Sequence, residues 1–185
     1  MKNKDHKTVW KLFTIADWEK EQNYLRAQHK AGWKFDRVDF HNRYHFTRCK
    51  PEDVVYQLDY NPDGLAHKEE YVQMFADCGW EYLQDYVGYS YFRKPVAQMN
   101  GKDEEIFCDD ASRLDMLRRV FNGRMVPALI VLLLCIMPNI PGNLQAPTRD
   151  SVTFLVLSLI LFLIYGVVFG NFALQYWKLR RGERK

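Results

Sequence analysis

Two stretches of the sequence decide the fold: residues 24–46 read YLRAQHKAGWKFDRVDFHNRYHF, and residues 71–92 read YVQMFADCGWEYLQDYVGYSYF. They resemble each other at a constant offset of 47 residues. The corresponding pairs are Tyr24 and Tyr71, Gly32 and Gly79, Trp33 and Trp80, Phe35 and Tyr82, and Tyr44 and Tyr91. Because a fixed offset is the signature of a repeat, we interpret residues 8–94 as two copies of one unit.

Each stretch contains a helical pattern that stops at Gly-Trp and continues as an extended, aromatic-rich segment. Glycine ends helices well because it adopts the left-handed backbone conformation without a steric penalty, and an apolar residue after it packs back on the last turn. Extended patterns bounded by turn residues predict strands over residues 9–15, 33–40, 44–48, 54–60, 80–87 and 89–93. The order strand, helix, strand, strand therefore occurs twice.

This order predicts an α+β cytoplasmic domain built from tandem strand-helix-strand-strand repeats with a mainly antiparallel sheet. We expect the two units to join edge to edge into one six-stranded sheet with both helices on one face, which gives a single core. The opposite face would be open and would carry alternate aromatic side chains.

Two apolar runs after the repeat predict a transmembrane hairpin. Residues 152–174 contain no charge in 23 positions, and as a helix they would rise roughly 35 Å, enough to cross a bilayer. The earlier run is shorter, but Arg118, Arg119 and Arg124 precede it, and basic residues also follow the second run. By the positive-inside bias, both termini face the cytoplasm and the short connection faces out.

These patterns divide the chain into six parts. The expected boundaries are the duplicated cytoplasmic domain at 1–94, a linker and juxtamembrane amphipathic helix at 95–124, transmembrane helices at 125–140 and 152–176, an external loop at 141–151 and a basic cytoplasmic tail at 177–185.

Charge and cysteine usage exclude two classes of protein. Residues 125–185 carry six of the 26 basic and two of the 23 acidic side chains, so the preceding part is close to neutral. Nucleic-acid binding needs clustered positive charge, and we expect no nucleic-acid partner. Four cysteines without CxxC spacing favour reduced thiols over a disulfide framework.

The whole chain resembles a bacterial family, domain of unknown function 2812. The segments that carry the resemblance are WEKEQNYLRAQHKAGWKF, YHFTR, YVQMFADCGWEYL, YSYFRK and IFCDDASRLDMLRRV, followed by two apolar spans. The resemblance implies a cytoplasmic domain on a membrane anchor, often encoded beside a transcription regulator of the PadR type, with no established activity. The doubled plan is also similar in architecture to drug-sensing proteins of the gyrase-inhibitor type, which hold small molecules in a cleft between repeats.

A set of aromatic residues is the best candidate for a binding surface. Flat, amphipathic rings hold drug-like or cationic ligands by stacking and cation–π contact, and exposed aromatic patches also bind proteins. The alternative is that half of them belong to the core and the rest cover the sheet. The candidates are Trp33, Tyr44, Tyr56, Trp80, Tyr89 and Tyr91.

The sequence offers little support for catalysis or metal binding. His41, His45 and Cys49 would need a bend in the chain to share a metal, because residues 45 and 49 lie roughly 13 Å apart in an extended strand. No spacing forces two of the carboxylates Asp36, Asp39, Asp59 and Asp85 together. We therefore expect no metal, no cofactor and no enzymatic activity.

Gly166 and Gly170 form a GxxxG pattern in the second span, with Asn171 beside it. Missing side chains let another helix approach, and asparagine can hydrogen-bond across the contact. The first span of the same chain is the leading partner; a homodimer and a different membrane protein stay open.

Together these features favour a membrane-anchored regulatory or sensor module that binds a small ligand or a protein partner without catalysis. The alternative is an accessory subunit of a transporter or another membrane assembly, in which the hairpin is the binding surface.

Overall fold

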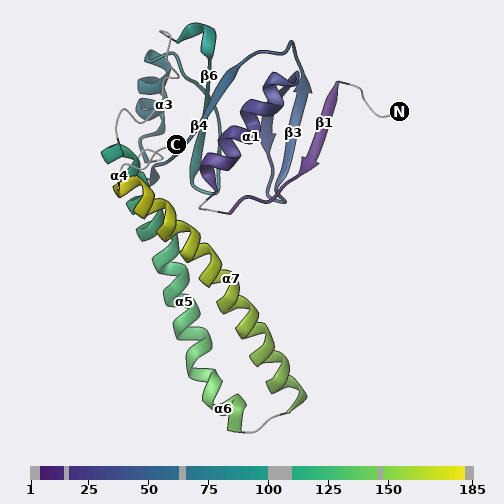
Figure 1. Cartoon of the computed structure of the whole chain (residues 1–185), viewed down its shortest axis with the longest axis vertical. Coiled ribbons are helices and arrows are strands. Elements are labelled where there is room, and N and C mark those ends of the chain that lie inside the picture. The colour runs from purple at the N-terminus through teal and green to yellow at the C-terminus, as the bar shows by residue number, and fades with distance from the viewer. Residues whose placement is uncertain (1–4, 15–16, 63–65, 100–109, 146–147, 182–185) are drawn as a thin grey trace. The chain divides into compact units, whose positions relative to one another are not determined.

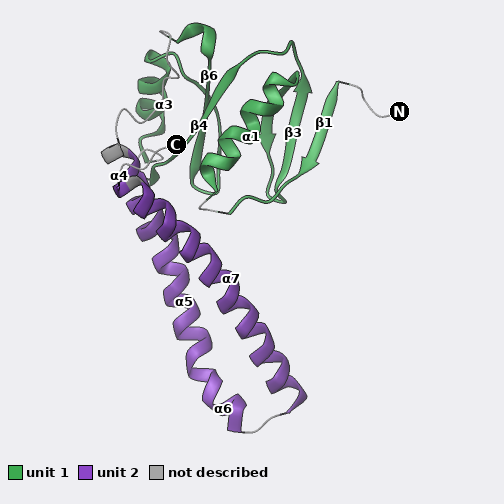
Figure 2. Cartoon of the chain, in the orientation of Figure 1, with its two compact units in different colours: residues 1–112 green, residues 113–185 purple. Residues whose placement is uncertain are grey.

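The computed structural model describes residues 5–14, 17–62, 66–99, 110–145 and 148–181 and divides into two units, residues 1–112 and residues 113–185 (Figure 2). The first unit is α+β, with two small antiparallel sheets (Figure 1). Its elements are β1 (His6–Trp10), α1 (Trp18–Lys30), β2 (Trp33–Val38), β3 (Arg43–Arg48), β4 (Val54–Tyr60), α3 (Lys68–Asp77), β5 (Glu81–Tyr86), β6 (Tyr89–Pro95) and a 3-10 turn over Val96–Gln98.

The strands form two three-stranded sheets, and the expectation of one six-stranded sheet is wrong. The first sheet has the order β1-β3-β2 and the second the order β4-β6-β5. Where β2 and β5 approach, the side chain of Gln84 accepts a hydrogen bond from the Val38 N–H (3.2 Å) and donates one to its carbonyl (3.3 Å). Because a side-chain amide satisfies the edge of β2 at this position, no backbone ladder joins the two sheets there.

The helices lie on opposite faces of the second sheet, which corrects the expectation of one shared face. Tyr56 and Tyr91 point to one face and contact α1, whereas Asp59 and Phe92 point to the other and contact Tyr71 and Phe75 of α3. All seven residues of β4 are buried. A strand covered on both faces needs apolar or well-bonded residues at every position, as VVYQLDY provides.

The two halves share local geometry through the middle of the repeat. Gly32 and Gly79 both end a helix with positive φ, at 84° and 79°. The ladders β2-β3 and β5-β6 are both interrupted by one extra residue, Asp36 in the first and Leu83 in the second. These features keep the offset of 47.

The last strands of the two halves keep a different offset. Phe46 lies opposite Phe35, and Phe92 lies opposite Tyr82, so the offset is 46 there. The second hairpin has the shorter turn, made by Val87 and Gly88 between the paired Tyr86 and Tyr89. Tyr91 therefore corresponds to His45 in the structure, and the sequence pairing of Tyr44 with Tyr91 is corrected by one residue.

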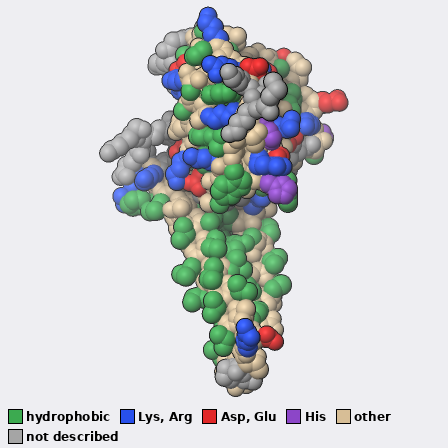
Figure 3. All heavy atoms as spheres, turned by 90° about the vertical axis from the view of Figure 1, so that its right-hand side faces the viewer, with side chains coloured by type: hydrophobic (Ala, Val, Ile, Leu, Met, Phe, Trp, Pro, Cys, Tyr) green, Lys and Arg blue, Asp and Glu red, His purple; other side chains and the backbone are tan. Residues whose placement is uncertain are grey.

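The second unit contains two long apolar helical segments, which fit a two-pass membrane protein. They cover Arg113–Gln145 and Arg149–Lys178, 33 and 30 residues, and apolar side chains cover the surface of this part (Figure 3). The elements are α4 (Asp110–Val120), a π-helical turn (Phe121–Met125), α5 (Val126–Ile136), a 3-10 turn (Met137–Asn139), α6 (Ile140–Gln145) and α7 (Arg149–Arg180).

Several expected boundaries shift. The first strand ends at Trp10 rather than at residue 15, and residues 11–14 have no regular structure. In the expected external loop, α6 runs to Gln145 and α7 begins at Arg149, so helices occupy most of these positions. Most of the expected linker, residues 100–109, lies outside the described residues.

Candidate functional site

An acidic side chain lies on the buried face of α1. Trp18, Glu21 and Leu25 follow each other at helical spacing, and all three are buried. Only 6% of the Glu21 surface is exposed. A carboxylate is expensive to bury without a hydrogen-bond or charge partner, so its surroundings define the candidate site.

Two tyrosines, one from each sheet, donate hydrogen bonds to the same oxygen of Glu21. The Tyr44 hydroxyl on β3 lies 2.7 Å from Oε1 and the Tyr91 hydroxyl on β6 lies 2.6 Å from it. Burial raises the pKa of Glu21, and the two hydroxyl donors offset part of this rise. The charge that contributes to this pKa is another carboxylate, Asp17, which raises it further. Among the described residues, the groups that contribute to the Glu21 pKa are two neutral donors and another carboxylate, and none is positively charged.

Aromatic rings surround the carboxylate. Phe35 stacks on Tyr91 with ring centroids 5.8 Å apart, and Tyr24 meets Tyr44 edge to face at 6.2 Å. One turn before Glu21, the indole N–H of Trp18 is buried with no hydrogen-bond partner among the described residues. The rings provide π-faces, and the indole provides an unsatisfied donor, in a region that otherwise resembles a core.

The segment after β1 covers one side of this cluster. Phe13 packs against both Tyr24 (5.7 Å) and Tyr44 (5.9 Å). The ammonium of Lys11 lies 4.7 Å from the centroid of Tyr24. The aromatic cluster therefore already accepts a cation on its outer side, from the chain itself.

The six aromatic residues proposed from the sequence do not form an exposed face. Tyr44, Tyr56, Trp80, Tyr89 and Tyr91 are buried, and Trp33 is partly covered, with Lys7 and Arg48 over its ring. They are internal because α1 and α3 cover the sheet faces that carry them.

Of those six residues, only Tyr44 and Tyr91 bond the same atom. The residue that joins them, Glu21, was not predicted from the sequence. Tyr44 and Tyr91 share Glu21 Oε1, while Tyr56 bonds His29, and Trp80 packs with Phe92 under α3. The available signal was an acidic residue three positions after Trp18 and four before Leu25, on the apolar face of a helix.

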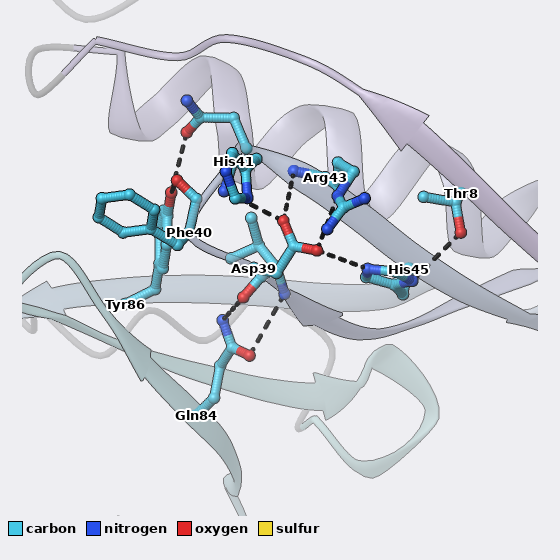
Figure 4. A network of polar contacts seen from close by, with 10 residues as sticks. Thr8, Asp39, Phe40, His41, Arg43, His45, Gln84 and Tyr86 are labelled. Atoms are coloured by element: carbon cyan, nitrogen blue, oxygen red, sulfur yellow. Dashed lines mark hydrogen bonds and ion pairs between the residues drawn. The ribbon is translucent and has the colours of Figure 1, made fainter.

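A second polar cluster lies on the outer face of the first sheet (Figure 4). The Asp39 carboxylate accepts hydrogen bonds from the main-chain N–H groups of His41 and Arg43 and from the Arg43 guanidinium. His45 lies between Asp39 (3.2 Å from Nε2) and the Thr8 hydroxyl (3.1 Å from Nδ1). Desolvation acts to raise the pKa of Asp39, but the hydrogen bonds from His45, Arg43 and His41 lower it to about 2.

This outer cluster has the order carboxylate, imidazole, hydroxyl, and the hydrogen bonds of Asp39 to residues 41 and 43 link the two sides of the hairpin turn. His41 contributes its main chain rather than its ring to Asp39. Within the described residues, no three His, Cys, Asp or Glu side chains are placed to hold a metal. The absence of enzymatic activity and of a cofactor stays a prediction.

The carboxylates considered for acid–base chemistry are bound by different donors. Asp36 accepts from Thr47, Asp59 from Tyr71, and Asp85 from Lys68 and Ser90. Each is thereby held in a local contact, and none shares a proton-donating side chain with Asp39 in these bonds.

In the second unit, the GxxxG pattern does not contact the first span. A Cβ atom built at Gly166 or at Gly170 meets no atom within 4 Å, and Asn171 is exposed. Phe169 and Phe172 instead contact Phe121, at 6.5 and 5.9 Å. The expectation of packing between these glycines and the first span is therefore wrong, because α7 turns its aromatic residues and not its glycines toward that segment.

Comparison with known proteins places the chain in a family without an assigned activity. No curated protein and no solved structure matches it. A family model described as "Protein of unknown function (DUF2812)" matches residues 17–130. This match covers most of α1 to α5 and more than half of the sequence, and the chain therefore belongs to the DUF2812 family.

Proposed function

We propose that the chain is a membrane-anchored, non-enzymatic regulatory or sensor module whose first unit binds an organic cation beside Glu21. The observation that carries the proposal is the buried Glu21 carboxylate, held by Tyr44 and Tyr91 at the meeting point of the two sheets. A ligand cation would supply the countercharge that the hydroxyl donors lack.

The surroundings of Glu21 favour a planar aromatic cation over an inorganic one. Phe35, Tyr24 and Tyr44 offer ring faces and edges near the carboxylate, and such rings bind desolvated organic cations. An inorganic cation would need several oxygen ligands, whereas Glu21 supplies one carboxylate and the tyrosines supply hydroxyls.

The segment around Phe13 is the proposed entry. Phe13 is only half-buried and belongs to residues 11–14, which lack regular structure. Its ring occupies the outer side of Tyr24 and Tyr44, where a ligand ring would stack. Displacing Phe13 and Lys11 together would exchange an internal cation–π contact for one with the ligand.

The anchor and the repeat complete the proposal. Basic residues precede the first apolar helix and follow the second, so we infer that both termini lie in the cytoplasm of a bacterial cell. We also infer that the two strand-helix-strand-strand halves arose by duplication, and each half contributes one tyrosine donor, from positions that do not correspond in the repeat. A change at Glu21 would then alter how the two halves pack, which is the step a sensor needs.

The experiment uses the full chain in detergent micelles and 1-methylquinolinium as the probe, with neutral quinoline as the matched compound at pH 7.5. We expect 1-methylquinolinium to raise the Tm of the first unit by a few degrees at saturation and quinoline to leave it unchanged, as follows from ligand linkage. Glu21→Gln should abolish the shift, because it removes the charge and keeps an acceptor oxygen.

Glu70→Gln is the control, since Glu70 is an exposed acidic residue of α3. Its response should match that of the wild type. Equal shifts with both compounds, or an undiminished shift in Glu21→Gln, would overturn the proposal.

The alternative function, an accessory subunit of a membrane assembly, is favoured by one observation. Gly166 and Gly170 leave an open stripe on α7 that no described residue fills. If the wild type gives no ligand shift, and if a membrane protein co-purifies with it but not with Gly166→Leu/Gly170→Leu, the accessory role is supported instead.

A further inference from the structure

The outer edge of the first sheet is unpaired within the described part of the chain. β1 is the last strand in the order β1-β3-β2, and no described strand pairs with its other side (Figure 1). Asp5 accepts a backbone bond from Arg48 (2.8 Å), and Lys11 donates one to Asn42 (3.1 Å), so these odd-numbered residues point toward β3. Backbone groups alternate along an antiparallel strand, and those of His6, Thr8 and Trp10 therefore point outward.

Two features that often protect an edge strand, a β-bulge and a proline, do not occur in β1. β1 pairs with β3 over five residues without a register shift, and it contains no proline. Its one charged residue, Lys7, is turned to the inner face, where it bonds Gln28 and lies over Trp33. On the outer face, 65% of Trp10 is exposed. The edge is therefore ready to accept another strand.

We propose that two copies of the chain associate by antiparallel pairing of β1 with β1 of the partner subunit, centred on Thr8. The pairing joins the two first sheets into one six-stranded sheet with twofold symmetry. Because the contact is isologous, it closes at a dimer and leaves no further free edge of this kind.

The charges of the strand select this register. Centred on Thr8, the pairing sets Asp5 opposite Lys11 of the partner subunit, His6 opposite Trp10 of the partner subunit, and Lys7 opposite Val9 of the partner subunit. Moving the centre to residue 7 sets two copies of Lys7 against each other. Moving it to residue 9 sets Lys7 against Lys11 of the partner subunit. Like charges directly opposite each other destabilise a strand pair and opposite charges stabilise it, so the Thr8 register is preferred.

A second copy is favoured over an unrelated peptide because the strand is complementary to itself. The same pairing places an Asp–Lys pair at each end and an aromatic–imidazole pair on each side of the centre. Confinement to one membrane would also raise the effective concentration of the partner. The inference depends on the geometry of β1 and not on ligand binding at Glu21.

The first test is disulfide cross-linking of the full chain in detergent micelles, with the native cysteines replaced by serine. Thr8→Cys would place two sulfurs at the twofold axis, where paired Cα atoms lie about 5.5 Å apart, within disulfide range. We expect mild oxidation to convert most of this variant to a covalent dimer. Thr47→Cys, on the same face but in the central strand, should stay at the background level.

The second test is a charge exchange read as solution mass by light scattering. Asp5→Lys should raise the dimer dissociation constant by about tenfold, since two symmetric pairs are reversed, and Asp5→Lys/Lys11→Asp should restore it. Glu70→Lys makes the same charge change on α3 and should leave the dimer intact.

Two results would overturn the inference. One is a monomeric wild type together with a Thr8→Cys variant that cross-links no more than the Thr47→Cys variant. The other is a dimer that persists unchanged in Asp5→Lys and in Thr8→Pro, which removes an outward N–H while the circular dichroism of the fold is retained.

Discussion

At the scale of single residues, Glu21 and His29 are two titratable groups on one buried face of α1 with opposite responses to pH. Burial raises the pKa of Glu21 and lowers that of His29, whose Nδ1 lies 2.7 Å from the Tyr56 hydroxyl. In both cases the fold favours the neutral form. The stability from neutral Glu21 is present below about pH 4.5 and is lost as pH rises through the folded pKa. The stability from neutral His29 is present above about pH 6.5 and is lost as pH falls through the folded pKa of His29.

Glu21→Gln should separate these two effects. The amide keeps an acceptor oxygen for Tyr44 and Tyr91 and cannot ionise, so the variant avoids the loss that the wild type suffers as pH rises. We expect the Tm of the variant relative to the wild type to increase between pH 4.5 and pH 8 by roughly 4 °C or more, the equivalent of about 1 kcal/mol for a domain of this size. Thermal unfolding followed by tryptophan fluorescence measures the difference.

His29 is present in both proteins, so its contribution cancels in this comparison. Glu70→Gln should track the wild type at every pH, because Glu70 is exposed. A difference between Glu21→Gln and the wild type that stays constant with pH would show that the fold does not raise the pKa of Glu21.

At the scale of elements, the two hairpins of the repeat form their turns with different residues. The second uses Val87 and Gly88 with φ of 52° and 83°, which is the pattern of a type I′ turn. Glycine adopts this conformation freely, but a β-branched residue such as valine is strained there. The first hairpin uses Asn42 at φ 55°, a residue that tolerates the left-handed region, and its Oδ1 also accepts a hydrogen bond from Tyr86.

Val87→Asn should therefore stabilise the first unit by about 1 kcal/mol, because it creates the preferred Asn-Gly turn. Denaturant unfolding monitored by fluorescence would show a higher midpoint with an unchanged m-value. Val87→Ala is the matched variant, since it shortens the side chain without favouring positive φ, and it should give little gain. Equal stabilisation by both variants would mean that the exposed apolar side chain of Val87, and not its backbone conformation, sets the cost.

At the scale of the whole chain, the sequence joins a nearly neutral α+β unit to two apolar helices with basic flanks. Charge is distributed so that the connection between α6 and α7 carries little net positive charge, with Arg149 beside Asp150. This asymmetry supports the proposal that both flanks lie on the cytoplasmic side.

Labelling of single cysteines tests this orientation. Cys78 is exposed at the end of α3, and Leu144 is exposed in α6. In a background without other cysteines, a membrane-impermeant maleimide should label Leu144→Cys in intact bacterial cells and Cys78 only after permeabilisation. The reverse pattern would place the first unit outside and would contradict the orientation.

Local features of the sequence were enough to predict most elements. The Gly-Trp boundaries at Gly32 and Gly79 end helices in the structure as predicted, because a helix terminus depends on neighbouring residues alone. The two apolar segments follow in the same way from composition, since a run of apolar residues long enough to cross a bilayer needs no distant partner. The α+β class and the family follow from the order and spacing of these local signals.

Tertiary packing decided which faces are covered and where the candidate site lies. Glu21 meets Tyr44, 23 residues away, and Tyr91, 70 residues away, and the local pattern around α1 contains no information about either contact. Tyr56, Tyr89 and Tyr91 became core because α1 and α3 cover opposite faces of the second sheet, an arrangement that a period of two along a strand does not specify. Sequence patterns record which residues share a face, whereas the energy of burial depends on what covers that face, and this is set only when distant segments come together.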